Sequence, residues 1–435
     1  MGARHDDTGR GHTGCPGGGD HDAGRNPGCG RCDRDVGRRL DHVLRLERHD
    51  GPVRGGVRPG RGRRLRTGGP GGSCGGTRGA GPDVPAGHVP AGHLPSGHHA
   101  PTGDHLDRRL GRQAVTSVGT TAPAAVIGTV RAMASDVTLF GRPGDDRSAA
   151  DPVVARALDV FPAVHAACTR FDPTSPLMEA NTRPDAWHDV PAVLLYAVRA
   201  AHRAHLATGG RFDPRVLDDL VRLGYDRSLP FEDGGVTTGG AVSGREAPGP
   251  WTPRFRSGRR LQLHLGGVPV DLGGIAKSLA VRWSTDLLAA ELDDFLLDAG
   301  GDCYCSGTGP EDDGWRVAVE DPAGGQRPVA VLALRDVGCA TSSTRLRRWR
   351  AGDAPAHHLI DPATGRPGGE GLAAVTVVAP DTADAEVVAK DLFLRGAPGI
   401  AEAAARSGVA ALWVTSDGDV AASAALAPHV VWWAP

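Results

Sequence analysis

The sequence predicts an α+β fold in which helices and mixed or antiparallel sheets form separate layers. Two observations support this prediction. Some strand patterns follow one another as hairpins, as at 315–320 and 328–334. Others alternate with helical patterns, as at 374–379, 384–394 and 411–415. A doubly wound parallel sheet requires regular alternation of strands and helices along the chain, so this class is not expected.

The start of the chain lacks these patterns. Residues 1–113 contain no Ile, Phe, Trp, Tyr or Lys. Such a segment cannot bury enough apolar surface to offset its conformational entropy, so we expect a disordered tail over 1–120. Three interpretations stay open: a zinc site at Cys29 and Cys32, an RNA-binding segment without aromatic residues, or translation from a start codon set too far upstream of a native start near Val115 or Met133.

Charge and cysteine usage restrict the partners and the compartment. The tail has more arginines than acids, while the whole chain carries a formal net charge of −2. The remainder is therefore acidic, which argues against a nucleic-acid partner. The chain opens without an apolar export signal and has no long apolar run, and Cys303 and Cys305 diverge from one face of a strand without pairing. These features predict a reduced, cytoplasmic protein.

The first half of the ordered region is expected to be mainly helical. A strand is predicted over 130–140, amphipathic helices over 149–167 and 191–208, a turn over 171–176 and a surface loop over 230–258. The helix positions expected to be buried are Val153, Ala157, Val160 and Val164, then Val193, Ala197, Ala200, Ala204 and Leu206.

The second half is expected to alternate between strands and helices. A hairpin is predicted from 261–265 and 268–271, a helix over 275–292, and a buried strand over 295–299 that ends in a glycine turn. The inward face of the helix contains Ile275, Leu279, Trp283 and Leu287.

Six sequence blocks occur in an order that closely resembles the FAD:protein FMN transferase (ApbE) family. They are the Met133 strand, Arg170–Ser175, Thr208–Pro214, Val270–Lys277, Asp298–Asp302 and His357–Gly365. The resemblance covers nearly all of the ordered region and implies one ApbE-like domain over 129–425. It also implies two interlocked T-fold-like α/β subdomains with mixed or antiparallel sheets and a cleft for FAD.

The resemblance implies an enzyme that transfers FMN from FAD to a threonine hydroxyl of a flavoprotein, releases AMP and uses Mg²⁺. Attack by a hydroxyl on a diphosphate needs in-line positioning and charge neutralisation more than a protein nucleophile. Acceptors in the family are often membrane-associated. Two alternatives stay open, namely hydrolysis of FAD to FMN and AMP, and FAD binding without turnover.

Matching the family motifs gives the expected site residues. Gly273 and Gly274 precede a helix, where backbone N–H groups receive phosphate oxygens. His358 is the expected proton acceptor or phosphate ligand, while His357 is expected to face solvent. Positions expected to contact FAD are Met133, Phe171, Arg211, Phe212, Asp213, Asp271, Lys277, Asp302, Thr341, Ser342 and Leu359.

The expected metal site departs from the family pattern. The family has a carboxylate and, four residues later, a hydroxyl as ligands, together with a backbone oxygen near Gly274. Here Glu386 and Lys390 occupy those two positions, and Lys277 and Lys390 are the only lysines of the chain. A protonated lysine cannot bind Mg²⁺. Three interpretations stay open: Lys390 acts catalytically in place of the metal, the site has lost transfer activity, or Glu386 and Lys390 are a structural helix pair. For a functional site, we expect one cavity to contain Asp271, Lys277, Glu386, Lys390 and His358.

Overall fold

The computed structural model describes residues 124–231 and 235–434. The tail expected over 1–120 lies outside the described residues. Eight strands form one sheet in the order β1-β2-β7-β8-β11-β16-β17-β18, and every neighbouring pair in it is antiparallel. A smaller sheet contains a parallel pair. The prediction of an α+β fold with mixed and antiparallel sheets is therefore confirmed.

The large sheet consists of two halves with the same succession of elements: two strands, two helices and two further strands, with insertions between them. The first half contains β1 (Ala125–Ala132), β2 (Ser135–Gly141), α2 (Pro152–Cys168), α6 (Ala276–Leu288), β7 (Phe295–Ala299) and β8 (Asp302–Ser306). The second contains β11 (Val337–Ser343), β16 (Leu372–Ala379), α7 (Thr382–Phe393), α8 (Gly396–Ser407), β17 (Ala410–Thr415) and β18 (Val420–Ala422). Pairing of β8 with β11 joins the halves, which confirms the predicted pair of interlocked subdomains.

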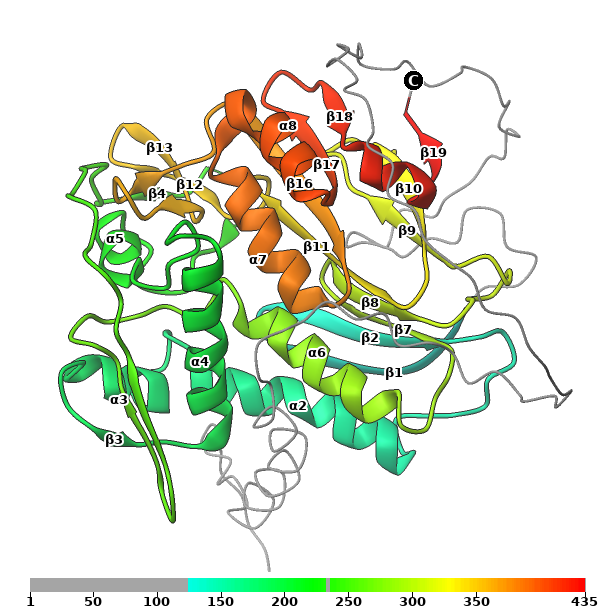
Figure 1. Ribbon diagram of the computed structural model, residues 1–435, viewed down its shortest axis with the longest axis horizontal. Coiled ribbons are helices and arrows are strands. Elements are labelled where there is room, and N and C mark those ends of the chain that lie inside the picture. Colours follow the sequence, from blue (N-terminus) through cyan, green and yellow to red (C-terminus); the bar gives the residue numbers. More distant parts are fainter. Residues whose placement is uncertain (1–123, 232–234, 435) are drawn as a thin grey trace, which may run out of the picture.

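Both faces of the large sheet are covered. Helices α2, α6 and α7 lie across one face (Figure 1), where Trp283 of α6 is completely buried. The opposite face packs against β9 (Trp315–Val319), β10 (Ala330–Leu334), β19 (Val430–Trp433) and the 3₁₀ helix η3 (Ala424–His429). The predicted hairpin of β9 and β10 is confirmed. Cys303 and Cys305 of β8 are free and buried on this face, as expected.

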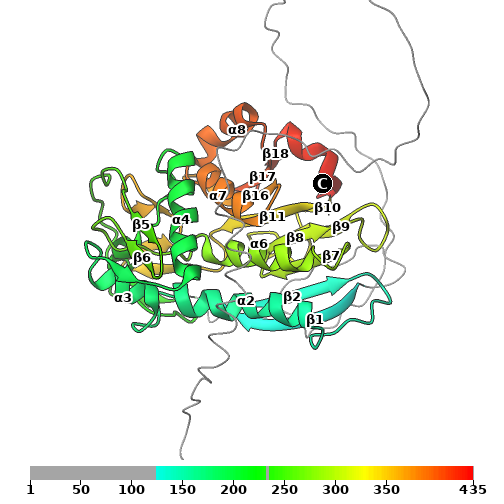
Figure 2. The ribbon, with the colours of Figure 1, turned by 60° about the horizontal axis from the view of Figure 1, so that its bottom comes forward.

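The remaining elements lie at one side of the large sheet. Both views place α3, α4 and the β5–β6 pair there (Figures 1 and 2). The helices of this region are α3 (Pro176–Thr182), α4 (Ala192–Ala207) and α5 (Leu217–Arg222), and its strands are β3 (His188–Asp189), β4 (Thr237–Thr238), β5 (Arg254–Ser257) and β6 (Leu261–His264). Four short strands from the second half complete the fold, namely β12 (Arg348–Ala351), β13 (Ala354–His357), β14 (Ile360–Asp361) and β15 (Arg366–Pro367). Within the described ranges, no helix combines the length and apolarity needed to cross a bilayer.

Two predicted strands are wrong in detail. The strand expected over 130–140 is two strands, because Met133 and Ala134 adopt positive φ angles of 53° and 59° and form a tight turn. The hairpin expected from 261–265 and 268–271 does not form. Strand β6 pairs with β5 and β3 instead. The side-chain amide of Asn181 bonds both the N–H and the carbonyl of Val270, so that backbone is satisfied without a strand partner.

The predicted helix faces are largely correct. The four apolar positions expected on α2 are buried, and so are Val193, Ala197, Ala200 and Ala204 of α4. Leu206 is an exception, since 64% of it is exposed. It follows Ala204 by two residues and therefore points to the other side of the helix. On α6, Ile275, Leu279 and Trp283 are buried, while Leu287 packs at the edge of the core.

Gly338 sets the distance between β11 and the start of α7. A Cβ at this position would lie 2.2 Å from the Thr382 nitrogen and 2.3 Å from the Asp381 carbonyl carbon, both backbone atoms. We expect Gly338→Ala to lower the free energy of unfolding by about 3 kcal/mol, because the backbone must shift to accept the methyl group. Urea denaturation measures this loss. Gly258→Ala is the matched control, since nothing lies within 4 Å of a Cβ there; equal losses in both variants would contradict the packing argument.

Candidate functional site

The glycine turn before α6 is held from two sides. The Asp271 N–H donates to the Pro214 carbonyl at 2.7 Å, and the Gly273 N–H donates to Asp271 Oδ1 at 2.8 Å. A Cβ on Gly274 would lie 3.1 Å from Lys390 Cε and 3.6 Å from Phe212 Cε2. The lysine of α7 therefore lies directly against this turn, where a side chain larger than hydrogen would displace it by a few tenths of an ångström. Asp271, Phe212, Gly274 and Lys390, which the sequence predicted for one site, lie together.

Lys277 holds the turn between β7 and β8. Its Nζ donates to the carbonyl oxygens of Ala299 at 2.7 Å and Gly300 at 3.3 Å, and it lies 2.9 Å from Asp302 Oδ2. An ammonium group has three N–H donors, so these three acceptors use them all. The other carboxylate oxygen of Asp302 accepts the Thr341 N–H at 3.4 Å. Lys277 and Asp302 thus connect α6 to both central strands of the sheet.

Glu386 and Lys390 form an ion pair on the face of α7 that is turned toward the glycine turn. The Lys390 Nζ donates to Glu386 Oε1, and the side chains are only 14% and 10% exposed. The other oxygen, Glu386 Oε2, is buried without a hydrogen-bond partner. Burial, followed by the charge of Asp302, raises the pKa of Glu386 above its ordinary value. The pair therefore carries an unsatisfied acceptor that faces the same region as Asp302.

The residues expected to bind Mg²⁺ do not fit that ion. Mg²⁺ requires octahedral oxygen ligands at about 2.0–2.1 Å. Of Gly274, Glu386 and Lys390, only Glu386 offers a carboxylate, and one of its oxygens is bonded to the Lys390 ammonium. Across residues 124–231 and 235–434, no group of three or more His, Cys, Asp or Glu side chains is placed to hold a metal.

His358 is held in one tautomer by the chain itself. Its backbone N–H donates to the Arg347 carbonyl at 3.3 Å, and its ring Nδ1 lies 3.4 Å from the same oxygen. A carbonyl only accepts, so we assign the ring proton to Nδ1, which leaves Nε2 as an acceptor. Burial, helped by the charges of Arg347 and Lys390, lowers the pKa of His358 well below its usual range. His358 is therefore a neutral imidazole near neutral pH.

His357 does not face solvent as expected. Its ring lies edge-on to the Phe393 ring of α7 with the centroids 6.1 Å apart, and burial lowers its pKa to about 4. Strand β13 ends at His357, and both His357 and His358 are partly buried. Leu359, the next residue, is buried as well.

Arg170 is a residue that the sequence analysis did not single out. Its guanidinium carbon lies 4.2 Å from the ring centroids of both Phe171 and Tyr225, and its Nε lies 3.7 Å from Asp271 Oδ2. Its Nη2 is buried without a partner, whereas Phe171 is 44% exposed. The only sequence signal was its position directly before Phe171 in a family block. Arg170 orients both Phe171 and Asp271.

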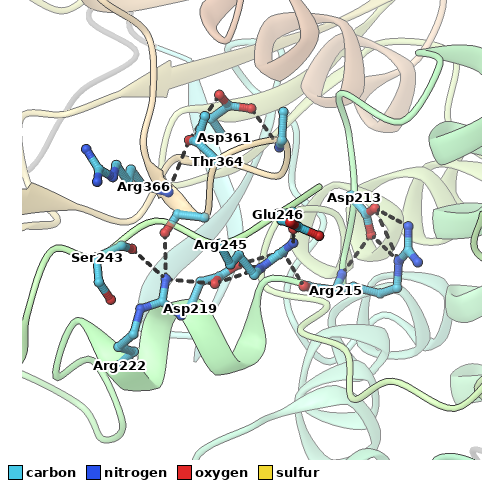
Figure 3. Close-up of polar contacts among 12 residues, drawn as sticks. Asp213, Arg215, Asp219, Arg222, Ser243, Arg245, Glu246, Asp361, Thr364 and Arg366 are labelled. Atoms are coloured by element: carbon cyan, nitrogen blue, oxygen red, sulfur yellow. Dashed lines mark hydrogen bonds and ion pairs between the residues drawn. The ribbon is translucent and has the colours of Figure 1, made fainter. Parts of the chain in front are cut away.

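Asp213 is engaged in a buried ion pair (Figure 3). Its carboxylate lies 2.7 Å from Arg215 Nη2 and 3.4 Å from His205 Nδ1. Arg245 continues the network, because its Nη2 donates to the Arg215 carbonyl and its guanidinium makes three hydrogen bonds to the Asp219 carboxylate. Asp219 also pairs with Arg222, whose Nη2 donates to the Gly365 carbonyl. These contacts join the block at 208–214 to the block at 357–365. Asp213 therefore fixes the Arg215 side chain in this structure.

The other predicted positions lie around the same region. Arg211 pairs with Asp391 of α7 at 3.1 Å, a partner that the sequence analysis missed. The Ser342 Oγ is buried without a partner, and the Thr341 Oγ1 bonds the Thr376 hydroxyl at 2.9 Å. The partly buried Met133 lies in the β1–β2 turn, and the Ser135 Oγ of this turn lies 2.8 Å from where a Cβ on Gly300 would sit.

A surface depression of about 560 Å³ borders the Arg245–Asp219 network. It contains none of the predicted site positions and is lined by Gly244, Arg245, Glu246, Ala363, Thr364 and Arg366. Figure 3 shows that Thr364 turns back to Asp361, whose Oδ2 accepts its hydroxyl at 3.2 Å. Asp361 therefore stabilises the turn that follows His358.

Fold and site together define a class of α+β proteins in which a glycine turn at a helix start meets polar side chains from both halves of one sheet. The model of the ApbE family matches residues 129–413, which is more than half of the chain. The chain therefore belongs to the ApbE family.

Related proteins and structures agree with this assignment. The chain is 34% identical over 181 residues to the FAD:protein FMN transferase of Treponema pallidum, covering 39% of this chain and 50% of that protein. It is 30% identical over 161 residues to the Escherichia coli K12 protein of the same name, covering 37% of this chain and 46% of that protein. The chain thus matches about half the length of these curated relatives.

Two solved structures share the fold. The ApbE protein of Thermotoga maritima aligns with a TM-score of 0.56 at 21% identity, covering 70% of this chain and 99% of that one. The flavin transferase ApbE of Vibrio cholerae aligns with a TM-score of 0.55 at 22% identity, covering 71% and 100%.

Asp298 gives the site region a pH-dependent stability. It lies on β7, accepts the Gly301 N–H at 3.0 Å, and burial raises its pKa to about 7. A raised carboxyl pKa means that the folded state holds its proton to higher pH than the unfolded state. Stability from this group is therefore full below about pH 4 and is lost as the pH rises to about 7.

We expect Asp298→Asn to remove this loss. Between pH 5 and 8 the unfolding free energy of the unmodified protein should fall by about 2 kcal/mol more than that of the variant, since one pKa unit corresponds to about 1.4 kcal/mol. Urea denaturation at both pH values measures the difference. Asp417→Asn, at an exposed position, is the control. Identical pH slopes for the unmodified protein and Asp298→Asn would rule out this role.

Proposed function

We propose that this protein is an FAD:protein FMN transferase. The neutral imidazole of His358, with Nε2 left as an acceptor, is the observation that supports this activity most directly. A hydroxyl nucleophile needs a base that is unprotonated at working pH, and a partly buried histidine near cationic side chains meets that requirement. The names of the relatives in Treponema and Escherichia support the same activity.

The proposed reaction transfers the FMN part of FAD to a protein threonine. The threonine Oγ attacks the phosphorus atom on the flavin side of the diphosphate, and its proton passes to His358 Nε2. The bond from that phosphorus to the bridging oxygen breaks, so AMP leaves with the bridging oxygen and its electron pair. The products are AMP and a phosphoester-linked FMN.

Other residues would bind and orient FAD. The Gly274 N–H of the turn at the start of α6 is suited to a phosphate oxygen, since the Gly273 N–H is bonded to Asp271 and the next two N–H groups to the Leu272 carbonyl. The exposed ring of Phe171, stacked on Arg170, offers a flat apolar surface to the flavin. The partnerless polar atoms of Arg170 and Ser342 are available to FAD groups. Mg²⁺ is left out of this reaction because Gly274, Glu386 and Lys390 do not provide its ligands.

The acceptor and the compartment are also proposals. We infer that the acceptor is a flavoprotein with a threonine FMN site, associated with a membrane, and that residues 129–425 form the transferase domain. A cytoplasmic location is supported by four free cysteines in the described part of the chain, Cys168, Cys303, Cys305 and Cys339.

The test of this function is incubation with FAD and a flavoprotein domain that carries a flavinylation threonine. We expect AMP by chromatography and an FMN adduct on the acceptor by mass spectrometry, and no adduct when that threonine is replaced by valine. AMP without an adduct would instead indicate FAD hydrolysis. Bound FAD without AMP would indicate a binding protein.

His358→Asn should slow adduct formation by about 10²–10⁴-fold, the usual contribution of a general base. Asparagine retains the hydrogen-bonding capacity but cannot take the hydroxyl proton. Single-turnover rates between pH 5 and 8 give the measurement, and FAD affinity of the variant is the control for an intact site. A rate within 3-fold of the unmodified protein would show that another group takes the proton.

A further inference from the structure

We propose that the ammonium group of Lys390 binds the diphosphate of FAD and takes the place of a divalent cation in this protein. The inference rests on the proposed function, because it concerns the same site. It starts from the disagreement between the implied Mg²⁺ site and the side chains present. One carboxylate oxygen of Glu386 is already bonded to Lys390, and a lysine nitrogen that carries its proton repels a metal ion.

Lys390 and Lys277 differ in the number of N–H donors that remain free for a ligand. The three donors of Lys277 are directed to Ala299, Gly300 and Asp302. Among the described residues, Lys390 has Glu386 as its hydrogen-bond partner, which uses one of its three donors. Two N–H groups of Lys390 therefore remain for a ligand, and Lys390 is the better diphosphate ligand of the two.

The position of Lys390 suits this role. Its Cε lies 3.1 Å from where a Cβ on Gly274 would sit, so the side chain runs against the turn that opens α6. A diphosphate oxygen received by the Gly274 N–H would come within reach of the ammonium. The single positive charge then neutralises part of the charge that develops on the diphosphate.

Stability alone is a poor reason for this ion pair. Removing two charges from water costs more than their attraction returns unless every donor and acceptor is satisfied, and Glu386 Oε2 is buried without a partner. The i,i+4 pair of Glu402 and Arg406 on α8 is the ordinary case, with side chains 72% and 67% exposed. The Glu386–Lys390 pair, at 10% and 14%, is largely removed from water, and its ammonium lies beside the Gly274 turn.

The first experiment needs no substitution. The dissociation constant for FAD is measured on the full chain by equilibrium dialysis, first with about 5 mM EDTA to remove divalent cations and then with added MgCl₂. We expect the two dissociation constants to agree within about 2-fold, since neutralisation comes from the protein itself. Loss of FAD binding in EDTA would overturn the proposal.

Variants then test the residue. Lys390→Met should weaken FAD binding about 10-fold or more in EDTA, because it removes the charge and keeps the length of the side chain. Lys390→Thr should bind FAD more tightly with MgCl₂ than with EDTA. Arg406→Met is the control and should bind like the unmodified protein. Circular dichroism establishes that each variant is folded. Unchanged FAD affinity in folded Lys390→Met would overturn the proposal.

The outcomes separate this inference from the proposed function. Adduct formation that requires added Mg²⁺ in the unmodified protein would overturn the role of Lys390 and leave the transferase activity standing. EDTA-resistant FAD binding through Lys390, without AMP release, would support the inference and overturn the transferase.

Discussion

The close approach of α7 to the centre of the sheet is the constraint on which the site depends. Gly338 of β11 lies against the first residues of α7, so the helix starts directly over the strand. Arg282 of α6 fixes the same end, with Nε 2.9 Å from Asp381 Oδ1 and Nη2 2.8 Å from Asp384 Oδ1. Because α7 cannot move away from α6 or β11, Lys390 two turns later is held against Gly274.

Much of the fold was predictable because it depends on local patterns. Apolar residues at every third or fourth position identified α2, α4 and α6, and a glycine turn identified the end of β7. The errors arise where tertiary contacts replace local ones. The backbone at Val270 is satisfied by the Asn181 amide, 89 residues away, and no pattern near 268–271 indicates this.

The members of the site were more predictable than their roles. Motif order identified Asp271, Lys277 and Asp302, and the structure pairs Lys277 with Asp302. Their roles depend on which of their donors and acceptors are already bonded to other residues, and the sequence alone does not show this. Lys277 is bound to a turn, and Asp213 is bound to Arg215. Arg170 was missed because a cation between two aromatic rings requires Tyr225, 55 residues further on.

The charges of the site explain why the free N–H donors of Lys390 matter. Lys277 and Asp302 neutralise each other, and so do Lys390 and Glu386. An anionic ligand that binds here must receive a hydrogen bond without breaking either ion pair. A charge left unpaired away from water costs on the order of 3–5 kcal/mol. Lys390 meets this condition: it can keep its bond to Glu386 and still offer two N–H groups. The pair of residues that departs from the family pattern therefore leaves two N–H donors available to an anionic ligand.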